Sequence, residues 1–220
     1  MPTECCCVLF TKPARPGRVK TRLIGALTPV QAAELHRAFL DDVLLTLAER
    51  TFELRIAWAL EPGESVPEGP IPAVIQRGAD LGSRLFSALS DFSEQHPYVL
   101  ALGSDHPSIE LARVEEAFSC LEQGADVVIG PASDGGYYLI GLRRAAVQAE
   151  LFDGIAWSSP SVFAETLEKC ERAGLNVALL AEGNDVDSPA DLEQLTTFIT
   201  ASPGSCPNTR ELLREWGRLE

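Results

Sequence analysis

The chain has 220 residues, of which 45% are apolar and 23% are charged, a composition typical of a folded soluble protein with a substantial core. Its formal net charge of −14 disfavours nucleic acid or an anionic membrane surface as the main partner. No apolar run reaches the roughly 18–20 residues of a membrane span, and the N-terminus shows no basic leader, so we expect a cytoplasmic protein.

Segments typical of strands and of helices alternate along almost the whole chain. The first half predicts strands at 5–10, 52–60 and 73–76. Thr28, Pro29 and Gln31 have the pattern of a capping box with proline at the first helical position, which predicts the start of a helix. A second helix is predicted at about 80–94.

The second half continues this alternation. Strands are predicted at 98–103, 126–130, 137–142 and 176–180, and helices over 111–121, over about 159–173 and after Ser188. The connection at 131–136 is too short for a crossover helix, which predicts an antiparallel strand pair there. The pattern predicts a three-layer α/β/α sandwich with a mostly parallel sheet and one antiparallel strand. Residues 1–201 form the predicted domain, and 202–220 a C-terminal extension with a short helix.

The six cysteines include no C-x-x-C pair, and three of them are consecutive, at Cys5, Cys6 and Cys7. We interpret this run as a buried strand that uses thiols as small apolar side chains. A reactive or metal-binding cluster is the alternative, but successive strand residues point to opposite faces, so the three thiols do not converge in a regular strand. His36 and His96 are predicted to be ordinary helix-surface residues.

The loop after the first predicted strand carries five of the 18 basic residues of this acidic chain. Arginine forms bidentate contacts with phosphate, lysine supplies a point charge, and Gly17 permits close approach of the backbone to a ligand. We therefore predict a phosphate-binding loop, although its spacing is neither G-x-x-x-x-G-K-[ST] nor G-x-G-x-x-G. A solvated basic loop that balances acidic neighbours is the alternative. The cations are Lys12, Arg15, Arg18, Lys20 and Arg22.

Carboxylates also occur in the loops after two other predicted strands. Asp105, with Ser104 before it, comes directly after the strand at 98–103. Asp185 and Asp187 lie between the strand at 176–180 and the helix capped by Ser188. Ligands of such sheets bind beyond the carboxyl ends of the strands, where a carboxylate beside a phosphate suits an oxygen-preferring divalent ion. Helix capping alone is the alternative interpretation.

Two glycine-rich stretches complete the candidates. The stretch around 134–136 is either a turn or a part of the site that lies close to a ligand, and the stretch at 76–84 is suited to hold a base or a ribose. Trp157, Ser158 and Ser159 would line an acceptor pocket or simply pack in the core. The first stretch contains Asp134, Gly135 and Gly136, and the second contains Gln76, Gly78, Asp80 and Gly82.

Four motifs occur in the order FTKPARPGRVKTRL, GSDHP, GPASDGGYYLIGL and DVDSPADL. In this order they resemble a family of bacterial glycosyltransferase-A-type, or nucleotide-diphospho-sugar, transferases, and the resemblance covers about residues 5–198. More distantly the chain is similar to the phospholactate and molybdopterin guanylyltransferases. The resemblance implies an α/β/α nucleotide-binding fold, a transferase domain at 1–201 and a bound Mg²⁺ or Mn²⁺.

The resemblance also implies roles for individual residues. Asp105 would be the principal metal ligand and Asp187 the second, with Asp185 as the alternative to Asp187. Lys20 and Arg22 would hold phosphates. Asp134 would face the transferred group together with Gly135 and Gly136.

Three functions remain open at this stage. The density of cations favours nucleotidyl transfer, in which a phosphorylated small acceptor attacks a nucleoside triphosphate and pyrophosphate leaves. The alternative is glycosyl transfer from a nucleotide-diphospho-sugar to a small acceptor, with Asp134 or Asp153 as a general base. A nucleotide-binding module without turnover is the third. The sequence leaves a homodimer open.

Overall fold

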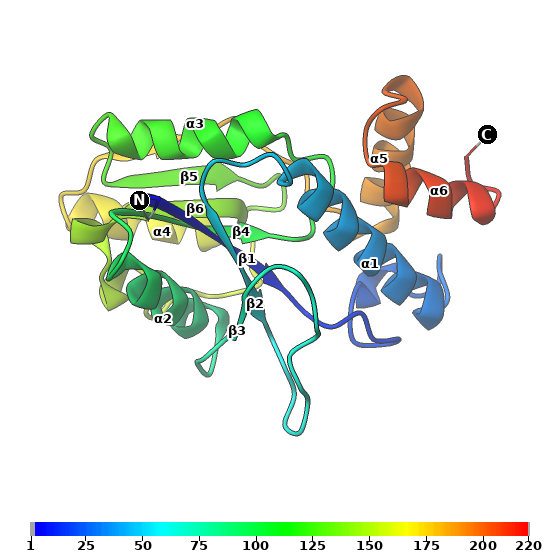
Figure 1. Ribbon diagram of the computed structural model, residues 1–220, viewed down its shortest axis with the longest axis horizontal. Helices are drawn as coiled ribbons and strands as arrows, with labels where there is room; N and C mark the ends of the chain where they lie inside the picture. The colour runs from blue at the N-terminus through cyan, green and yellow to red at the C-terminus, as the bar shows by residue number, and fades with distance from the viewer. Residues whose placement is uncertain (1–2, 220) are drawn as a thin grey trace.

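The computed structural model describes residues 3–219, which form a seven-stranded sheet between layers of helices (Figure 1). The strand order is β3-β2-β1-β4-β6-β5-β7, and β6 alone runs antiparallel to its two neighbours. This confirms the predicted fold class. The strands are β1 (Cys5–Thr11), β2 (Glu53–Trp58), β3 (Ala73–Ile75), β4 (Tyr98–Gly103), β5 (Val127–Pro131), β6 (Tyr137–Arg143) and β7 (Val177–Leu179).

Two pairs of helices cover the sheet. In Figure 1, α1 (Pro29–Thr46) and α3 (Leu111–Glu122) lie on one face, and α2 (Leu81–Ser93) and α4 (Val162–Arg172) lie on the other. Alternate residues of β4 serve the two cores: Leu100 and Leu102 pack on the α1/α3 side, whereas Val99 and Ala101 pack on the α2/α4 side. This double burial explains why the strand is apolar along its length. No helix within residues 3–219 has the length and hydropathy needed to cross a membrane.

The predicted helix starts are confirmed at three positions. Thr28 before α1, Asp80 before α2 and Ser188 before α5 (Pro189–Ala201) each take part in a reciprocal capping box. Each box satisfies backbone N–H groups that the first helical turn leaves without a partner. The side chain of Asp80, a predicted ligand-binding residue, is therefore occupied with helix capping.

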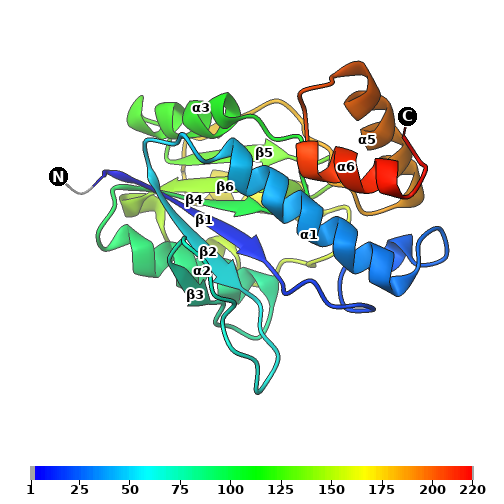
Figure 2. The same cartoon turned by 45° about the vertical axis from the view of Figure 1, so that its right-hand side comes forward.

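The C-terminal helices α5 and α6 (Pro207–Glu215) lie beyond the sheet, against α1 (Figure 2). Apolar residues of α5 and α6 share a third core with Leu35 and Phe39 of α1. The buried Asp42 carboxylate of α1 accepts four hydrogen bonds of 2.6–2.9 Å from backbone and side-chain donors of Asn208 and Thr209. A charged acceptor on α1 thus anchors the first turn of α6. Short 3₁₀ helices lie at Thr21–Leu23, Arg144–Ala146 and Ala149–Leu151.

The cysteine run forms a buried strand segment, as predicted. Cys6 and Cys7 are both fully buried, on opposite faces of the sheet. Burial, with a contribution from the nearby Glu53 charge, raises the pKa of the Cys6 thiol to about 12. The prediction that His36 and His96 are helix-surface residues is wrong, because both are almost fully buried. His36 lies on the side of α1 that faces the end of the sheet, and His96 lies in the connection from α2 to β4.

Candidate functional site

The candidate site lies where the strand order reverses, at the carboxyl ends of β1 and β4. β2 and β3 extend the sheet on one side of this pair, and β6, β5 and β7 extend it on the other. The loops that leave β1 and β4 therefore diverge and open a crevice, the usual ligand position in such sheets. Within it, Ser104 Oγ donates a hydrogen bond to Thr11 Oγ1 over 2.9 Å, which links the ends of the two strands.

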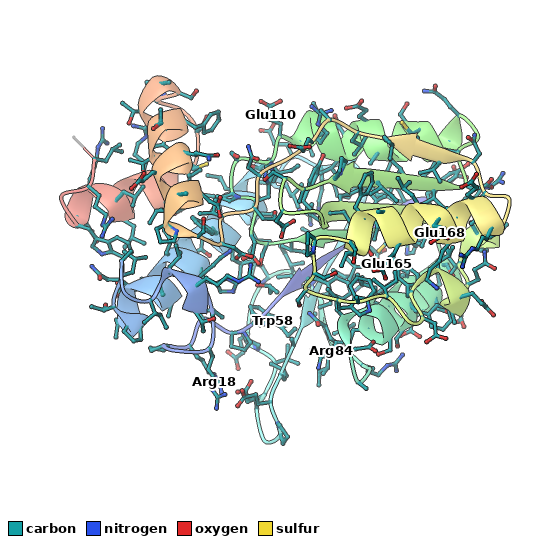
Figure 3. All side chains as sticks on the ribbon, turned by 180° about the vertical axis from the view of Figure 1, so that it is seen from behind. Arg18, Trp58, Arg84, Glu110, Glu165 and Glu168 are labelled. Carbon is teal, nitrogen blue, oxygen red and sulfur yellow. The ribbon has the colours of Figure 1, made fainter. Side chains whose placement is uncertain are left out.

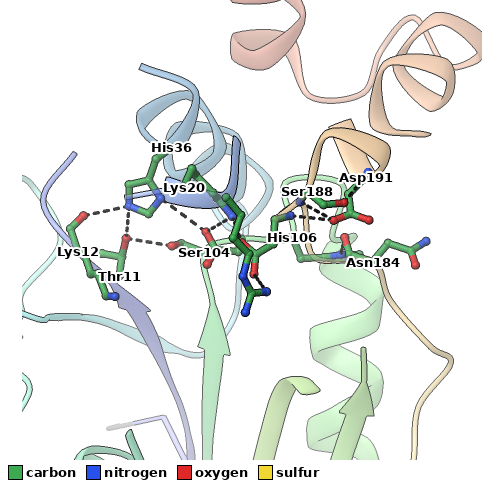
Figure 4. Close-up of polar contacts among 12 residues, drawn as sticks. Thr11, Lys12, Lys20, His36, Ser104, His106, Asn184, Ser188 and Asp191 are labelled. Atoms are coloured by element: carbon green, nitrogen blue, oxygen red, sulfur yellow. Dashed lines mark hydrogen bonds and ion pairs between the residues drawn. The ribbon is translucent and has the colours of Figure 1, made fainter. Parts of the chain in front are cut away.

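Lys20, from the basic loop after β1, lies between two carboxylates (Figure 4). Its Nζ is 2.6 Å from Asp105 Oδ1, an ion pair, and donates a hydrogen bond of 3.0 Å to Asp187 Oδ1. The Lys20 side chain is 2% exposed, and its Nζ lies 5.3 Å from the centroid of the Phe39 ring. The backbone of Lys20 is left-handed, with φ of 46°. Arg22 is 3.8 Å from Asp187 Oδ2. The predicted cationic and acidic loops are thus in direct contact.

The charges in this cluster fix one another's ionisation. Burial on its own lowers the pKa of Lys20, but the adjacent Asp105 and Asp187 outweigh it and hold this pKa above its ordinary value. Partial burial likewise raises the pKa of Asp105, yet the Lys20 charge and then His36 hold it well below its usual range. Lys20 is therefore a cation and Asp105 an anion at neutral pH.

His36 is a site residue that the sequence analysis missed. Its Nε2 lies 3.0 Å from the Lys12 carbonyl oxygen and 3.3 Å from Thr11 Oγ1, while Nδ1 lies 3.5 Å from Asp105 Oδ1 (Figure 4). The imidazole connects α1, the basic loop and the Asp105 carboxylate. The available signal was the position of His36, one residue after Leu35 and three before Phe39, on the buried side of the helix.

A cavity of about 440 Å³ opens beside this cluster. Five cations line it, among them Arg18 from the basic loop and Arg84 from α2, both labelled in the view from behind (Figure 3). Such a concentration of positive charge suits a polyanion such as a nucleotide phosphate chain. Predicted site residues that line this cavity are Lys12, Lys20, Arg22, Gln76, Ser104, Asp105 and Asp187.

A second cavity of about 340 Å³ adjoins the first, since Arg22, Ser158 and Asp187 border both. It is lined by Asp134 and Asp185, and by the Trp157–Ser158–Ser159 stretch. An acceptor pocket is one of the two interpretations predicted for this stretch. Asp134 Oδ1 accepts a hydrogen bond of 2.9 Å from the Gly136 backbone, and Gly136 also lines the cavity.

Asp185 differs from Asp105 and Asp187 because it forms no ion pair with any of the described residues. Its Oδ1 is buried and has no hydrogen-bond partner among them. Burial, followed by the charge of Asp105, raises the pKa of Asp185 to about 7. A buried carboxylate oxygen without a partner, on a residue that lines a cavity, is available to a ligand or to a proton.

Other predicted site residues have structural contacts. Arg15 forms an ion pair with Glu64 and borders a different cavity, of about 280 Å³. This ion pair agrees with the alternative interpretation, in which the basic loop balances acidic neighbours. Gln76 donates hydrogen bonds to the carbonyls of Thr11 and Ala57. The predicted glycines differ in how much space surrounds them. A Cβ atom added at Gly17 would meet open space. A Cβ atom would overlap Ser83 if added at Gly78, Trp157 if added at Gly82, and Pro160 if added at Gly135. A base-binding role for 76–84 stays a prediction.

The donors at the crevice suit a hard divalent cation. Asp105, Asp185 and Asp187 offer only carboxylate oxygens, the ligand type that Mg²⁺ and Mn²⁺ prefer, and the unpartnered Asp185 oxygen is one such donor. Within residues 3–219 the ligand oxygens of these three do not all lie within 4.8 Å of one another, and the Lys20 ammonium separates two of them. The three carboxylates therefore fit a divalent ion that takes the place of the Lys20 ammonium between Asp105 and Asp187.

Comparison with known proteins shows the family. Residues 33–159 match the model of a family described as an uncharacterized protein conserved in bacteria, DUF2064. A solved structure from Desulfovibrio desulfuricans G20, provisionally named a nucleotide-diphospho-sugar transferase, is 37% identical with a TM-score of 0.90 over 97% of this chain and 95% of that one. The chain therefore belongs to the DUF2064 family and has the nucleotide-diphospho-sugar transferase fold. No curated protein matches the sequence.

More distant structures share the fold. The CMP:2-keto-3-deoxy-manno-octonic acid synthetase complexed with CTP is 16% identical, with a TM-score of 0.55 over 90% of this chain and 99% of that one. The molybdopterin-guanine dinucleotide biosynthesis protein A of Archaeoglobus fulgidus is 14% identical, with the same TM-score and coverage. Rv0371c of Mycobacterium tuberculosis, solved with manganese, is 15% identical, with a TM-score of 0.50 over 88% and 98%. The predicted similarity to molybdopterin guanylyltransferases is thus confirmed at the level of fold.

Proposed function

We propose that the protein is a nucleotidyltransferase that uses a nucleoside triphosphate and a phosphorylated small-molecule acceptor. The observation that carries this proposal is the five-cation cavity beside Asp105 and Asp187 at the switch point of the sheet. A triphosphate has more negative charge than a sugar diphosphate, so it makes better use of this many cations. Relatives of the same fold support the proposal, since one was solved with CTP and another is named for guanine dinucleotide biosynthesis.

In the proposed reaction an acceptor phosphate oxygen attacks the α-phosphorus of the triphosphate. The new oxygen–phosphorus bond forms as the bond from the α-phosphorus to the bridging oxygen breaks, and pyrophosphate leaves with that electron pair. Lys20 and Arg22 would hold the leaving pyrophosphate, because they are the cations nearest the carboxylate pair. Asp134, Gly135 and Gly136 would face the acceptor from the second cavity.

Asp105 and Asp187 would hold the Mg²⁺ or Mn²⁺, with Asp185 as the alternative to Asp187. When bound, such an ion neutralises charge that develops on phosphate oxygens. In the absence of the ion, the Lys20 ammonium neutralises the charge of Asp105 and Asp187. When a nucleotide enters with the ion, this ammonium would turn from the carboxylates to the phosphates. A manganese complex exists for one relative of this fold.

Glycosyl transfer is the second candidate, favoured by Asp185. Its raised pKa, near 7, is suited to a general base for an acceptor hydroxyl, and Asp134 lines the same cavity. The name of the 37% identical relative points the same way. Both candidates share the nucleotide and the divalent ion, and they differ in the bond that is broken. A binding module without turnover is the third candidate.

The deciding experiment measures thermal unfolding with Mn²⁺ and either the four ribonucleoside triphosphates or a panel of nucleotide sugars. A ligand at ~100 times its Kd stabilises the protein by about 2.7 kcal/mol. Stabilisation by a triphosphate but not by nucleotide sugars is expected, followed by pyrophosphate release detected by phosphorus NMR. Stabilisation by nucleotide sugars alone would retire nucleotidyl transfer, and binding without turnover across many acceptors would favour the module.

Substitution of Asp105 tests the metal assignment. Asp105→Asn keeps the shape of the side chain but removes its charge, so the Mn²⁺ dependence of the nucleotide-induced shift should be lost. Asp41→Asn is the matched control, since Asp41 is a carboxylate of α1 with nearly the same side-chain exposure, 39% against 40% for Asp105, and pairs with Arg37 outside the crevice. Undiminished Mn²⁺ dependence in Asp105→Asn would mean that the metal lies elsewhere.

A further inference from the structure

Ligand-type side chains also converge at the opposite end of the sheet, where the parallel strands begin. Cys6 on β1 lies in register with Glu53 on β2, so their side chains point to the same face. His96 comes just before β4. One candidate ligand atom from each residue lies within 4.8 Å of the other two. The three consecutive thiols do not form a cluster, but one of them meets a histidine and a glutamate from other segments.

The neighbours of His96 and Glu53 leave one atom of each free for this cluster. His96 Nδ1 lies 2.8 Å from the Thr3 carbonyl oxygen, which only accepts, so Nδ1 has the hydrogen and a neutral ring keeps its lone pair on Nε2. Arg55 holds the other carboxylate oxygen, Glu53 Oε1, from Nε at 2.7 Å and Nη2 at 2.5 Å. Ligating histidines and carboxylates in metal sites have partners of this kind.

The two free atoms then face each other. Glu53 Oε2 lies 3.6 Å from His96 Nε2. With a neutral ring both atoms have lone pairs, which repel unless a proton or a metal ion lies between them. In a tetrahedral zinc site, metal bonds of about 2.1 Å to nitrogen and oxygen separate these two atoms by about 3.4 Å. The observed separation is close to that value. The Glu53 side chain is 29% exposed, so this carboxylate is the member of the cluster that solvent reaches.

We propose that Cys6, Glu53 and His96 bind a divalent transition-metal ion of the zinc type, with water as the fourth ligand. Thiolate, imidazole and carboxylate together select zinc or cobalt over Mg²⁺. Binding replaces the sulfur–hydrogen bond of Cys6 with a sulfur–metal bond, and the proton leaves to solvent. The ion joins β1, β2 and the α2–β4 connection, about 20 Å from the nucleotide site by the length of β4. It therefore stabilises the fold independently of the proposed function.

Cobalt(II) is the probe for this site. The full-length protein, freed of metal with a chelator, is titrated with Co²⁺ while thiolate-to-cobalt charge-transfer absorption is recorded. This absorption requires a sulfur ligand, so the carboxylates of the nucleotide site do not contribute to it. We expect one equivalent of cobalt to develop the band and Zn²⁺ to abolish it. Cys6→Ser should lose the band, and Glu53→Gln should weaken Co²⁺ binding at least about tenfold.

Cys7→Ser is the matched control, because Cys7 is an equally buried neighbour on the other face of the sheet. It should keep the band. Absence of the band at saturating Co²⁺ would leave His96 and Glu53 as an ion pair only and overturn the proposal, as would a band that persists in Cys6→Ser. If Cys6→Ser does not fold, the partly exposed Glu53→Gln decides the question. Nucleotide binding is measured separately, so a negative result here leaves the proposed function intact.

Discussion

Removal of the Lys20 charge tests the electrostatic account of the site. Lys20→Met keeps an unbranched side chain that can still pack on Phe39 but deletes the ammonium between Asp105 and Asp187. Both carboxylates then lose their nearest positive charge while Asp185 lies close by. The expected result is a less stable protein that binds a divalent cation more strongly than the wild type, because the ion no longer competes with the ammonium.

The magnitude follows from the exposure of the partners. Removal of one member of a buried ion pair costs about 3–5 kcal/mol, because it leaves an uncompensated buried charge. Here the side chains of Asp105 and Asp187 are 40% and 38% exposed, so water solvates part of their charge. A loss of about 2–3 kcal/mol is the appropriate estimate. At ~2–4 °C per kcal/mol for a chain of this size, the Tm should fall by roughly 4–12 °C.

Urea unfolding with and without Mn²⁺ measures both effects. Lys169→Met is the control, because Lys169 is a partly exposed lysine in the last turn of α4, with an expected change within about 0.5 kcal/mol. The added stability from Mn²⁺ should be larger in Lys20→Met than in the wild type. A Lys20→Met protein of wild-type stability and unchanged Mn²⁺ response would refute this account of the cluster.

Three further substitutions test other parts of the structure by urea unfolding. Asp42→Asn leaves one acceptor oxygen for four donors, so we expect a loss of about 2–4 kcal/mol and faster amide exchange in α6; a loss below 0.5 kcal/mol would mean that another contact anchors this helix. Gly135→Ala, with φ of 88° and a Cβ that overlaps a neighbouring loop, should cost about 1–3 kcal/mol more than Gly154→Ala, whose Cβ meets open space; equal costs would contradict the predicted overlap. A backbone N–H from Asn176 lowers the pKa of Asp126, so its stabilisation is full above the unfolded pKa of about 3.9 and is lost as the pH falls through the lower folded value. Asp126→Asn should therefore be less stable at pH 7 and approach the wild type below pH ~4, and a pH-independent difference would contradict this assignment.

The sequence predicted the elements of the fold because their signals are local. The capping residues Thr28 and Ser188 satisfy backbone donors within a few residues of themselves, so they were identified without tertiary structure. Asp80 caps α2 in the same way, although it was predicted to bind a ligand. The short connection before β6 likewise required an antiparallel pair, which the structure confirms. The Lys20 and Asp105 loops were predicted at one edge of the sheet, and their side chains are in contact.

The contacts of individual side chains were not predictable in this way. His36 and His96 were assigned to the surface, since helical periodicity does not show which polar residue is covered by a distant segment. Arg15 and Lys20 belong to the same basic loop and have the same charge sign. Only the fold shows that Arg15 pairs with Glu64 whereas Lys20 enters the crevice.

By itself, the sequence determined which segments are strands and helices, how their ends are capped and which loops hold cations or carboxylates. These properties depend on the period of apolar residues and on hydrogen bonds between near neighbours along the chain. The tertiary structure decided that β4 lies beside β1, that an ammonium separates two carboxylates, and that a thiol, an imidazole and a carboxylate meet at the other end of the sheet. Those contacts depend on long-range strand pairing and on burial. Both bring together side chains that are far apart along the chain, so local sequence patterns do not show which of them meet.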